Sequence, residues 1–133
     1  MSMLRNDPEW TDDKLESLAW DIYNFLLERG MWQDVIIYFN GKALSTHKIE
    51  GGKDVFAYNE KPFILMNEDP RDYFEYVNPC HILSMSFEGP FYKVMNGCLL
   101  GDFHTRSEFS NLLESRGLYY ECGNAWNLSL YKI

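Results

Sequence analysis

The residues of this chain that are best suited to nucleophilic or metal chemistry are its three cysteines and three histidines. Cys80 and His81 are adjacent, and a thiolate that the fold brings next to an imidazole could act as a nucleophile, so a small hydrolase is one hypothesis. Structural zinc sites usually draw on close pairs of cysteines, and this chain has no such pair. Cys98 and Cys122 stand among apolar neighbours, where free cysteines behave as small hydrophobes. We therefore expect neither a metal site nor a cofactor.

Other catalytic motifs that depend on spacing do not occur in the sequence. Ser84 and Ser86 lie in a strand-like pattern and not in the sharp turn that exposes a serine nucleophile. Gly-Gly-Lys-Asp at 51–54 lacks the frame of a phosphate-binding loop and indicates a turn. The formal net charge is −8, from 20 acids against 12 bases, and such a surface repels phosphate backbones. We therefore expect a protein without enzymatic activity and without a direct nucleic-acid ligand.

Acids and aromatic rings are most concentrated in the stretch 68–76, EDPRDYFEY. The residues of this stretch that we predict to form a binding surface are Glu68, Asp69, Asp72, Tyr73, Glu75 and Tyr76. Asp69 and Pro70 suit the first positions of a helix, so a short helix over 70–77 is predicted, with both tyrosines on one face. Exposed tyrosines provide rigid contact area, and acids beside them can pair with the arginines and lysines of a partner. In the alternative interpretation, the rings face the core and the acids are only solvated.

The last stretch of the chain, GLYYECGNAWNLSLYKI, holds a second group of aromatic residues. Its two strand-like runs are separated by Gly123-Asn124, which predicts a two-residue hairpin turn at that point. Alternation along the runs directs most of the large side chains of this hairpin toward the core. The rings that remain as candidates for an exposed binding surface are Tyr119, Trp126 and Tyr131.

The helices that must position these surfaces have clear boundaries in the sequence. Thr11 is a suitable N-cap, and the apolar residues after it recur at helical spacing until Arg29-Gly30, which predicts an N-terminal helix. Thr105 and Glu108 have the spacing of a capping box and predict a second helix near 105–116. The segment 88–97 fits either a return strand or two helical turns.

The strands are predicted from β-branched and aromatic runs bounded by turn residues. A hairpin is expected around Asn40-Gly41, and further strands are expected at 54–58, 61–66 and 81–87, before the hairpin at the C-terminus. The order of elements indicates an α+β fold in which helices pack against a mainly antiparallel sheet. At 133 residues and 46% hydrophobic composition, we expect a single domain over 1–133.

Composition and charge also restrict the compartment and the partner. No segment approaches the roughly 18 apolar residues that a membrane span needs, and the N-terminus lacks the apolar region of a secretory signal. We therefore expect a cytoplasmic protein with no membrane partner. The acidic balance favours a basic protein as the partner, because complementary charge accelerates encounter.

No motif places the chain in a known family. A compact, acidic, aromatic-rich protein without catalytic motifs is typical of small inhibitors that occupy a basic surface, such as immunity proteins and the inhibitors of defence nucleases that mobile elements carry. This likeness is one of type and not of residues. We therefore predict a non-enzymatic inhibitor of this kind, possibly directed against a nuclease. The alternatives are the small hydrolase and a structural homodimer that buries the surplus of aromatic residues across a two-fold interface.

Overall fold

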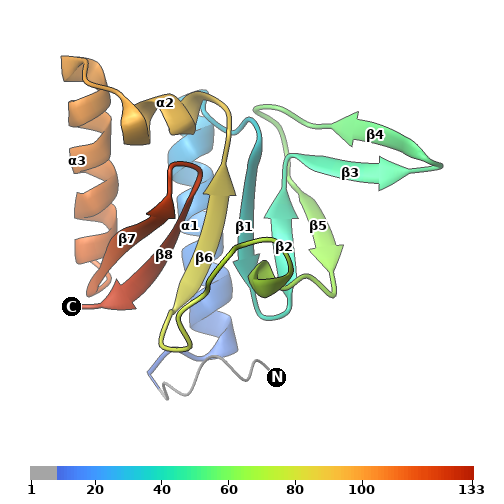
Figure 1. Cartoon of the computed structure of the whole chain (residues 1–133), viewed down its shortest axis with the longest axis horizontal. Helices are drawn as coiled ribbons and strands as arrows, with labels where there is room; N and C mark the ends of the chain where they lie inside the picture. The colour runs from blue at the N-terminus through green and yellow to red at the C-terminus, as the bar shows by residue number, and fades with distance from the viewer. Residues whose placement is uncertain (1–8) are drawn as a thin grey trace.

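The chain folds as an antiparallel sheet with helices on one face, as the sequence predicts (Figure 1). A computed structural model describes residues 9–133. The long helix α1 (Asp12–Glu28) lies behind the sheet in Figure 1, and α3 (Leu100–Glu114) stands beside it. The remaining elements are β1 (Val35–Phe39), β2 (Lys42–Ser45), β3 (His47–Glu50), β4 (Lys53–Phe56), β5 (Phe63–Met66), β6 (Leu83–Phe87), α2 (Pro90–Asn96), β7 (Leu118–Asn124) and β8 (Asn127–Lys132).

Six strands form the sheet in the order β5-β2-β1-β6-β8-β7, and every neighbouring pair is antiparallel. The turn between β1 and β2 is Asn40-Gly41, as predicted, and the φ angles of 51° and 73° at these residues are those that a type I′ turn needs. β3 and β4 pair with each other in a separate hairpin, which projects beyond β5 in Figure 1. β3 was not predicted as a strand of its own.

The inner face of the sheet packs against the helices and forms the main core. Alternate residues of the central strands point to this face, and the buried ones are Val35, Ile37, Phe39, Leu44, Leu83, Met85, Phe87, Leu128 and Leu130. They meet the apolar stripe of α1, whose N-cap is Thr11 as predicted. Burial of each such side chain contributes about 1.5–3 kcal/mol to the stability of the fold. This layer therefore fixes the sheet on the helices and leaves its other face available for a different role.

The opposite face, called the outer face here, is crossed by residues 67–82, called the outer loop. This loop runs in front of the sheet in Figure 1. Phe74 and Val77 of the loop pack on Tyr38 and Ala43 of the sheet in a second, smaller apolar cluster. The predicted helix over 70–77 is wrong, because only Pro70–Asp72 forms a single 3-10 turn. A segment rich in Asp, Tyr and Phe has low helical propensity, and packing of Phe74 and Val77 on the sheet holds the loop in another conformation.

The ambiguous segment 88–97 is helical, with Pro90 as the first residue of α2. The next helix, α3, begins at Leu100, earlier than predicted, and the proposed capping box is wrong. Thr105 lies inside the helix, where its hydroxyl donates a hydrogen bond of 3.1 Å to the Gly101 carbonyl. The helix starts earlier because Asp102 supplies the N-terminal contact instead, accepting a hydrogen bond of 3.3 Å from the Leu99 N–H.

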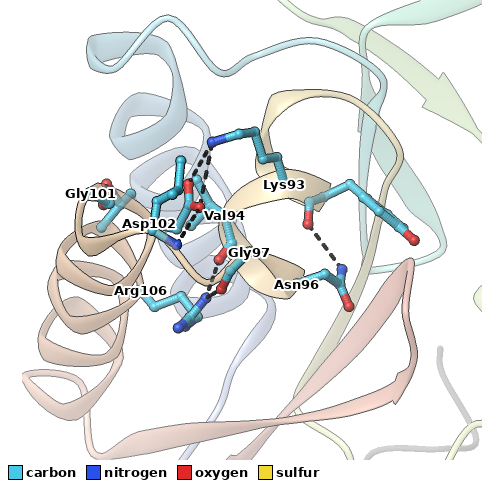
Figure 2. A network of polar contacts seen from close by, with 10 residues as sticks. Lys93, Val94, Asn96, Gly97, Gly101, Asp102 and Arg106 are labelled. Carbon is cyan, nitrogen blue, oxygen red and sulfur yellow. Dashed lines mark hydrogen bonds and ion pairs between the residues drawn. The ribbon is translucent and has the colours of Figure 1, made fainter.

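A polar network joins α2 to α3 at the corner between them (Figure 2). The ammonium group of Lys93 lies 3.1 Å from a carboxylate oxygen of Asp102, whose side chain is buried. The guanidinium of Arg106 donates hydrogen bonds of 2.6 and 2.8 Å to the carbonyls of Val94 and Gly97. These contacts satisfy carbonyls at the end of α2 that the helix itself leaves without partners.

The C-terminal hairpin is present, but its turn lies two residues later than predicted. Ala125 and Trp126 form the turn, and Asn124 still pairs with Asn127. The side-chain oxygen of Asn124 accepts a hydrogen bond of 2.9 Å from the Trp126 N–H, which builds the turn in the way asparagine often does. The extra residue is absorbed by an irregularity in the ladder between Cys122 and Asn124.

Candidate functional site

Three tyrosines lie in one region of the molecule at the β7 edge of the sheet, and we call them the tyrosine surface: Tyr76, Tyr119 and Tyr131. Tyr119 of β7 and Tyr131 of β8 lie opposite each other in register, with ring centroids 5.7 Å apart. Burial is the main reason that the pKa of Tyr131 is raised. Glu121, Tyr76 of the outer loop and Tyr119 raise this pKa further, so Tyr76 lies in the neighbourhood of Tyr131. Tyr76 is 71% exposed and Tyr119 is 42% exposed.

Tyr73, another predicted binding residue, is 55% exposed and lies three residues before Tyr76 in the outer loop. Its ring stacks on Tyr38 with a centroid distance of 6.0 Å. Its hydroxyl donates a long hydrogen bond of 3.4 Å to the Glu68 carboxylate, and the charge of Glu68 is the main reason that the pKa of Tyr73 is raised. Tyr73 therefore belongs to the acidic end of the loop.

The four predicted acids of the outer loop have different surroundings. Asp69 accepts hydrogen bonds of 3.0 Å at both carboxylate oxygens from Nε of Arg71, and this contact lowers the pKa of Asp69. Glu68 is half-buried, and its backbone N–H donates to the Gly41 carbonyl across 2.9 Å, which fixes the start of the loop on the β1–β2 turn. Asp72 and Glu75 are exposed.

Trp126 is half-buried and packs inward. Its ring meets Phe74 edge-on at 5.6 Å, within the apolar cluster beneath the outer loop. The structure thus brings Tyr76, Tyr119 and Tyr131 together and directs Trp126 into the packing that supports the loop. Glu121, two residues after Tyr119 on β7 and on the same face of the strand, is an exposed acid of this region that the sequence analysis did not select. The period of two along the strand was the signal that could have identified it.

A cavity of about 350 Å³ opens at the acidic end of the outer loop. It lies between the start of α1, the β1–β2 turn and the first residues of the loop. Its lining residues are Asp12, Leu15, Tyr38, Phe39, Asn40, Gly41, Asn67, Glu68, Asp69, Pro70, Arg71, His81 and Ile82. The volume is at the lower end of the range typical of ligand pockets. Glu68 and Asp69 of this lining were expected binding residues, but the sequence did not predict the cavity, because it forms only when the loop is laid across the sheet.

One wall of the cavity is formed by His81, which belongs to a buried hydrogen-bonded chain. Nδ1 of His81 and Oγ of Ser84 are 2.8 Å apart, and Oγ of Ser84 is 2.6 Å from Oγ of Ser129. Burial lowers the pKa of His81 to about 4, against the opposing effect of the nearby Asp69 charge, so the imidazole is neutral at pH 7. Ser84 has no exposed surface, and a substrate therefore cannot reach its hydroxyl.

The solvent exposure of two cysteines differs from what the sequence suggested. Cys98 and Cys122 are exposed, as is Cys80, so the expectation that apolar neighbours enclose them is wrong. Cys98 lies in the exposed corner between α2 and α3, and Cys122 lies at the irregular end of an edge strand, where little chain packs over it. Within residues 9–133, no group of three or more His, Cys, Asp or Glu side chains is placed to hold a metal ion.

Comparison with known proteins adds no family to this description. No family model matches the chain, and neither a curated protein nor a solved structure matches it. In the part of the chain that the structure describes, none of the helices has the length and apolar character to cross a membrane.

Proposed function

We propose that this protein is a non-enzymatic inhibitor that binds and covers a basic surface of another protein through its outer face. The observation that carries the proposal is the exposure of Tyr73, Tyr76 and Tyr119 among acidic side chains on one face of the sheet. Groups of exposed apolar side chains on one face often mark an interaction surface, and tyrosine is enriched among the residues that dominate binding at protein interfaces.

The charge of the chain supports a basic partner. The acids that accompany the rings are Glu68, Asp72, Glu75 and Glu121, and the chain as a whole carries a formal charge of −8. An acidic surface of this kind accelerates encounter with a basic protein and disfavours acidic competitors. Nuclease surfaces that bind phosphate backbones are basic for the same reason, so a nuclease is a suitable target class.

The support beneath the rings suits a binding surface that does not rearrange. Phe74 and Val77 anchor the outer loop on the sheet, and Tyr119 and Tyr131 lie on paired strands. Side chains held on a rigid scaffold lose less conformational entropy when a partner binds. We place the protein in the cytoplasm, because its three exposed free thiols are typical of a reducing compartment.

The test is quantitative capture of proteins from a lysate of the native host. The wild type is compared with Tyr76→Ala and Glu75→Lys on the outer face. The matched controls are Tyr92→Ala on α2 and Glu114→Lys on α3, two exposed positions away from that face. We expect a basic protein that the wild type and both controls retain and that both outer-face variants lose.

Three other outcomes contradict the proposal, and two of them point to the alternative functions. Retention of the same proteins by all five forms would mean that the outer face is not the contact surface. A concentration-dependent homodimer in sedimentation, disrupted by Tyr76→Ala, would mean that the exposed rings are covered by a second copy. Turnover of ester or phosphoester model substrates that is lost in Cys80→Ala would restore the hydrolase hypothesis.

A further inference from the structure

The cavity beside the outer loop has the size and lining of a receptor for one cationic side chain. Its volume of about 350 Å³ is within the range of ligand pockets and is large enough for an arginine side chain. Gly41 and Glu68 both line it, and the Glu68 N–H donates a hydrogen bond to the Gly41 carbonyl. This backbone contact ties the wall formed by the outer loop to the wall formed by the β1–β2 turn.

The lining charges select against anions. Among the charged side chains of the lining, three are acids (Asp12, Glu68 and Asp69) and one is a base (Arg71). His81 adds no positive charge at neutral pH, because burial depresses its pKa. Asp69 is engaged by Arg71 through Nε, whereas the hydrogen bond that Glu68 accepts from Tyr73 is long. Of these two carboxylates, Glu68 is the better able to accept a further donor.

The uncharged part of the lining combines polar residues with apolar ones, and the apolar ones suit an aliphatic stem. Leu15, Phe39, Pro70 and Ile82 contribute to the walls, and the side chain of each of them is buried in the fold. A long cationic side chain buries its methylene groups on such surfaces and keeps its charge near polar groups. A guanidinium suits a partly apolar cavity better than an ammonium does, because it is more weakly hydrated and presents several donors in one plane.

The cavity is continuous with the surface proposed as the contact region. Tyr38 lines the cavity and stacks on Tyr73, and Tyr73 in turn bonds Glu68. We propose that the cavity receives an arginine side chain of the basic partner, with Glu68 as the main acceptor of its guanidinium. This inference rests on the proposed function, since it names the group of the partner that the outer face recognises.

The experiment uses N-acetyl-L-arginine amide as the probe and follows the amide signals of the isotope-labelled protein by NMR. We expect saturable shifts confined to the lining, with Gly41, Asn67 and Ile82 as reporters, and a dissociation constant on the order of 1 mM. N-acetyl-L-lysine amide should bind more weakly. N-acetyl-L-citrulline amide has nearly the same shape without the charge and should produce no saturable shift.

Glu68→Gln keeps the shape of the side chain and should weaken arginine binding by about tenfold or more, since hydrogen bonds to charged groups are the stronger ones. Glu114→Gln is the matched control and should bind the probe as the wild type does. Equal binding of the citrulline probe, shifts that lie away from the lining, or unchanged binding in a folded Glu68→Gln variant would each overturn the inference.

Failure of the cavity and failure of the proposed function give different results. If the arginine probe does not bind while Tyr76→Ala and Glu75→Lys still release a captured basic protein, the cavity inference is wrong and the proposed function stands. If the probe binds at the lining but those two variants capture the same proteins as the wild type, the cavity is a site for a free guanidinium compound. In that case the inference about a partner's arginine is wrong together with the proposed function.

Discussion

The carboxylate of Asp102 occupies the space beside Gly97 that the β-carbon of any larger residue would need. A β-carbon at Gly97 would also collide with the backbone carbonyl of Lys93. The corner between α2 and α3 is therefore closed by a glycine that gives a buried carboxylate access to the Lys93 ammonium and to the Leu99 N–H. Close approach, and not a left-handed backbone, is the reason for glycine here, since its φ angle is −84°.

Gly97→Ala should destabilise the protein by about 1–3 kcal/mol, the usual cost of forcing extra atoms into a filled space. Gly101→Ala is the matched control. A β-carbon at Gly101 meets nothing within 4 Å, and Gly101 lies in the first turn of α3, so the change should stabilise by up to about 1 kcal/mol. Urea denaturation of both variants measures the difference. Equal stabilities for the two would show that the corner can relax around a methyl group.

The two threonines that the sequence marked as helix caps should respond differently to alanine. Thr11 accepts a hydrogen bond of 3.3 Å from the Lys14 N–H as the N-cap of α1, so Thr11→Ala should cost about 1 kcal/mol. Thr105 lies inside α3, and Thr105→Ala should change the free energy of unfolding by less than about 0.5 kcal/mol. Thermal melts of the two variants decide the point. A larger loss in Thr105→Ala would mean that α3 begins where the sequence suggested.

Those two threonines also show what the sequence can and cannot predict. Both have the local chemistry of a cap, and local chemistry was enough to identify α1, the Asn40-Gly41 turn and the α+β class. The start of α3 depends instead on Asp102, whose role follows from its burial against Lys93 and Gly97. A contact between two helices has no signature in a window of a few residues.

The residues of the candidate site were predictable from local sequence, as the caps were, but their arrangement in space was not. Composition alone drew attention to Tyr73, Tyr76 and the acids around them, and alternation selected Tyr119 and Tyr131. Their grouping was not predictable, because it depends on how the outer loop crosses the sheet, and Phe74 and Val77 determine that path through long-range packing. The cavity and the buried His81 depend on the same path.

His81 should make the stability of the protein sensitive to mild acid. Its pKa is lowered from 6.5 to about 4 in the fold, mainly by burial, with Asp69 opposing and Arg71 adding to the shift. The unfolded chain therefore takes up a proton on His81 below about pH 6.5, and the folded protein does so only near pH 4. The contribution of neutral His81 to the free energy of unfolding is fully present above pH 6.5. It is lost as the pH falls toward 4, which lowers the free energy of unfolding by up to about 3 kcal/mol.

His81→Gln cannot take up this proton, and its stability should depend less on pH over the same interval. Urea denaturation of the wild type and the variant at several values between pH 7.5 and pH 4 measures the two slopes. The carboxylates titrate in both proteins, so the difference between the slopes isolates His81. Identical slopes would mean that His81 of the folded protein accepts a proton at the usual pKa of histidine, near 6.5.

The outer loop offers a final prediction, because two aromatic residues that are two positions apart in it, Phe74 and Tyr76, have opposite roles. Phe74 is buried against Tyr38 and Trp126, so Phe74→Ala should lower the free energy of unfolding by about 3–5 kcal/mol. Tyr76 is mostly exposed, and Tyr76→Ala should change the free energy of unfolding by less than about 0.5 kcal/mol.

The effects of the two changes on partner binding should have the opposite order when both variants are folded. Tyr76→Ala should lose about 2 kcal/mol of binding free energy if the ring is a central contact. Urea denaturation and calorimetric titration with the captured partner measure the two quantities. A large loss of stability in Tyr76→Ala would place its ring in the core, and a partner that binds this variant as it binds the wild type would remove Tyr76 from the contact surface.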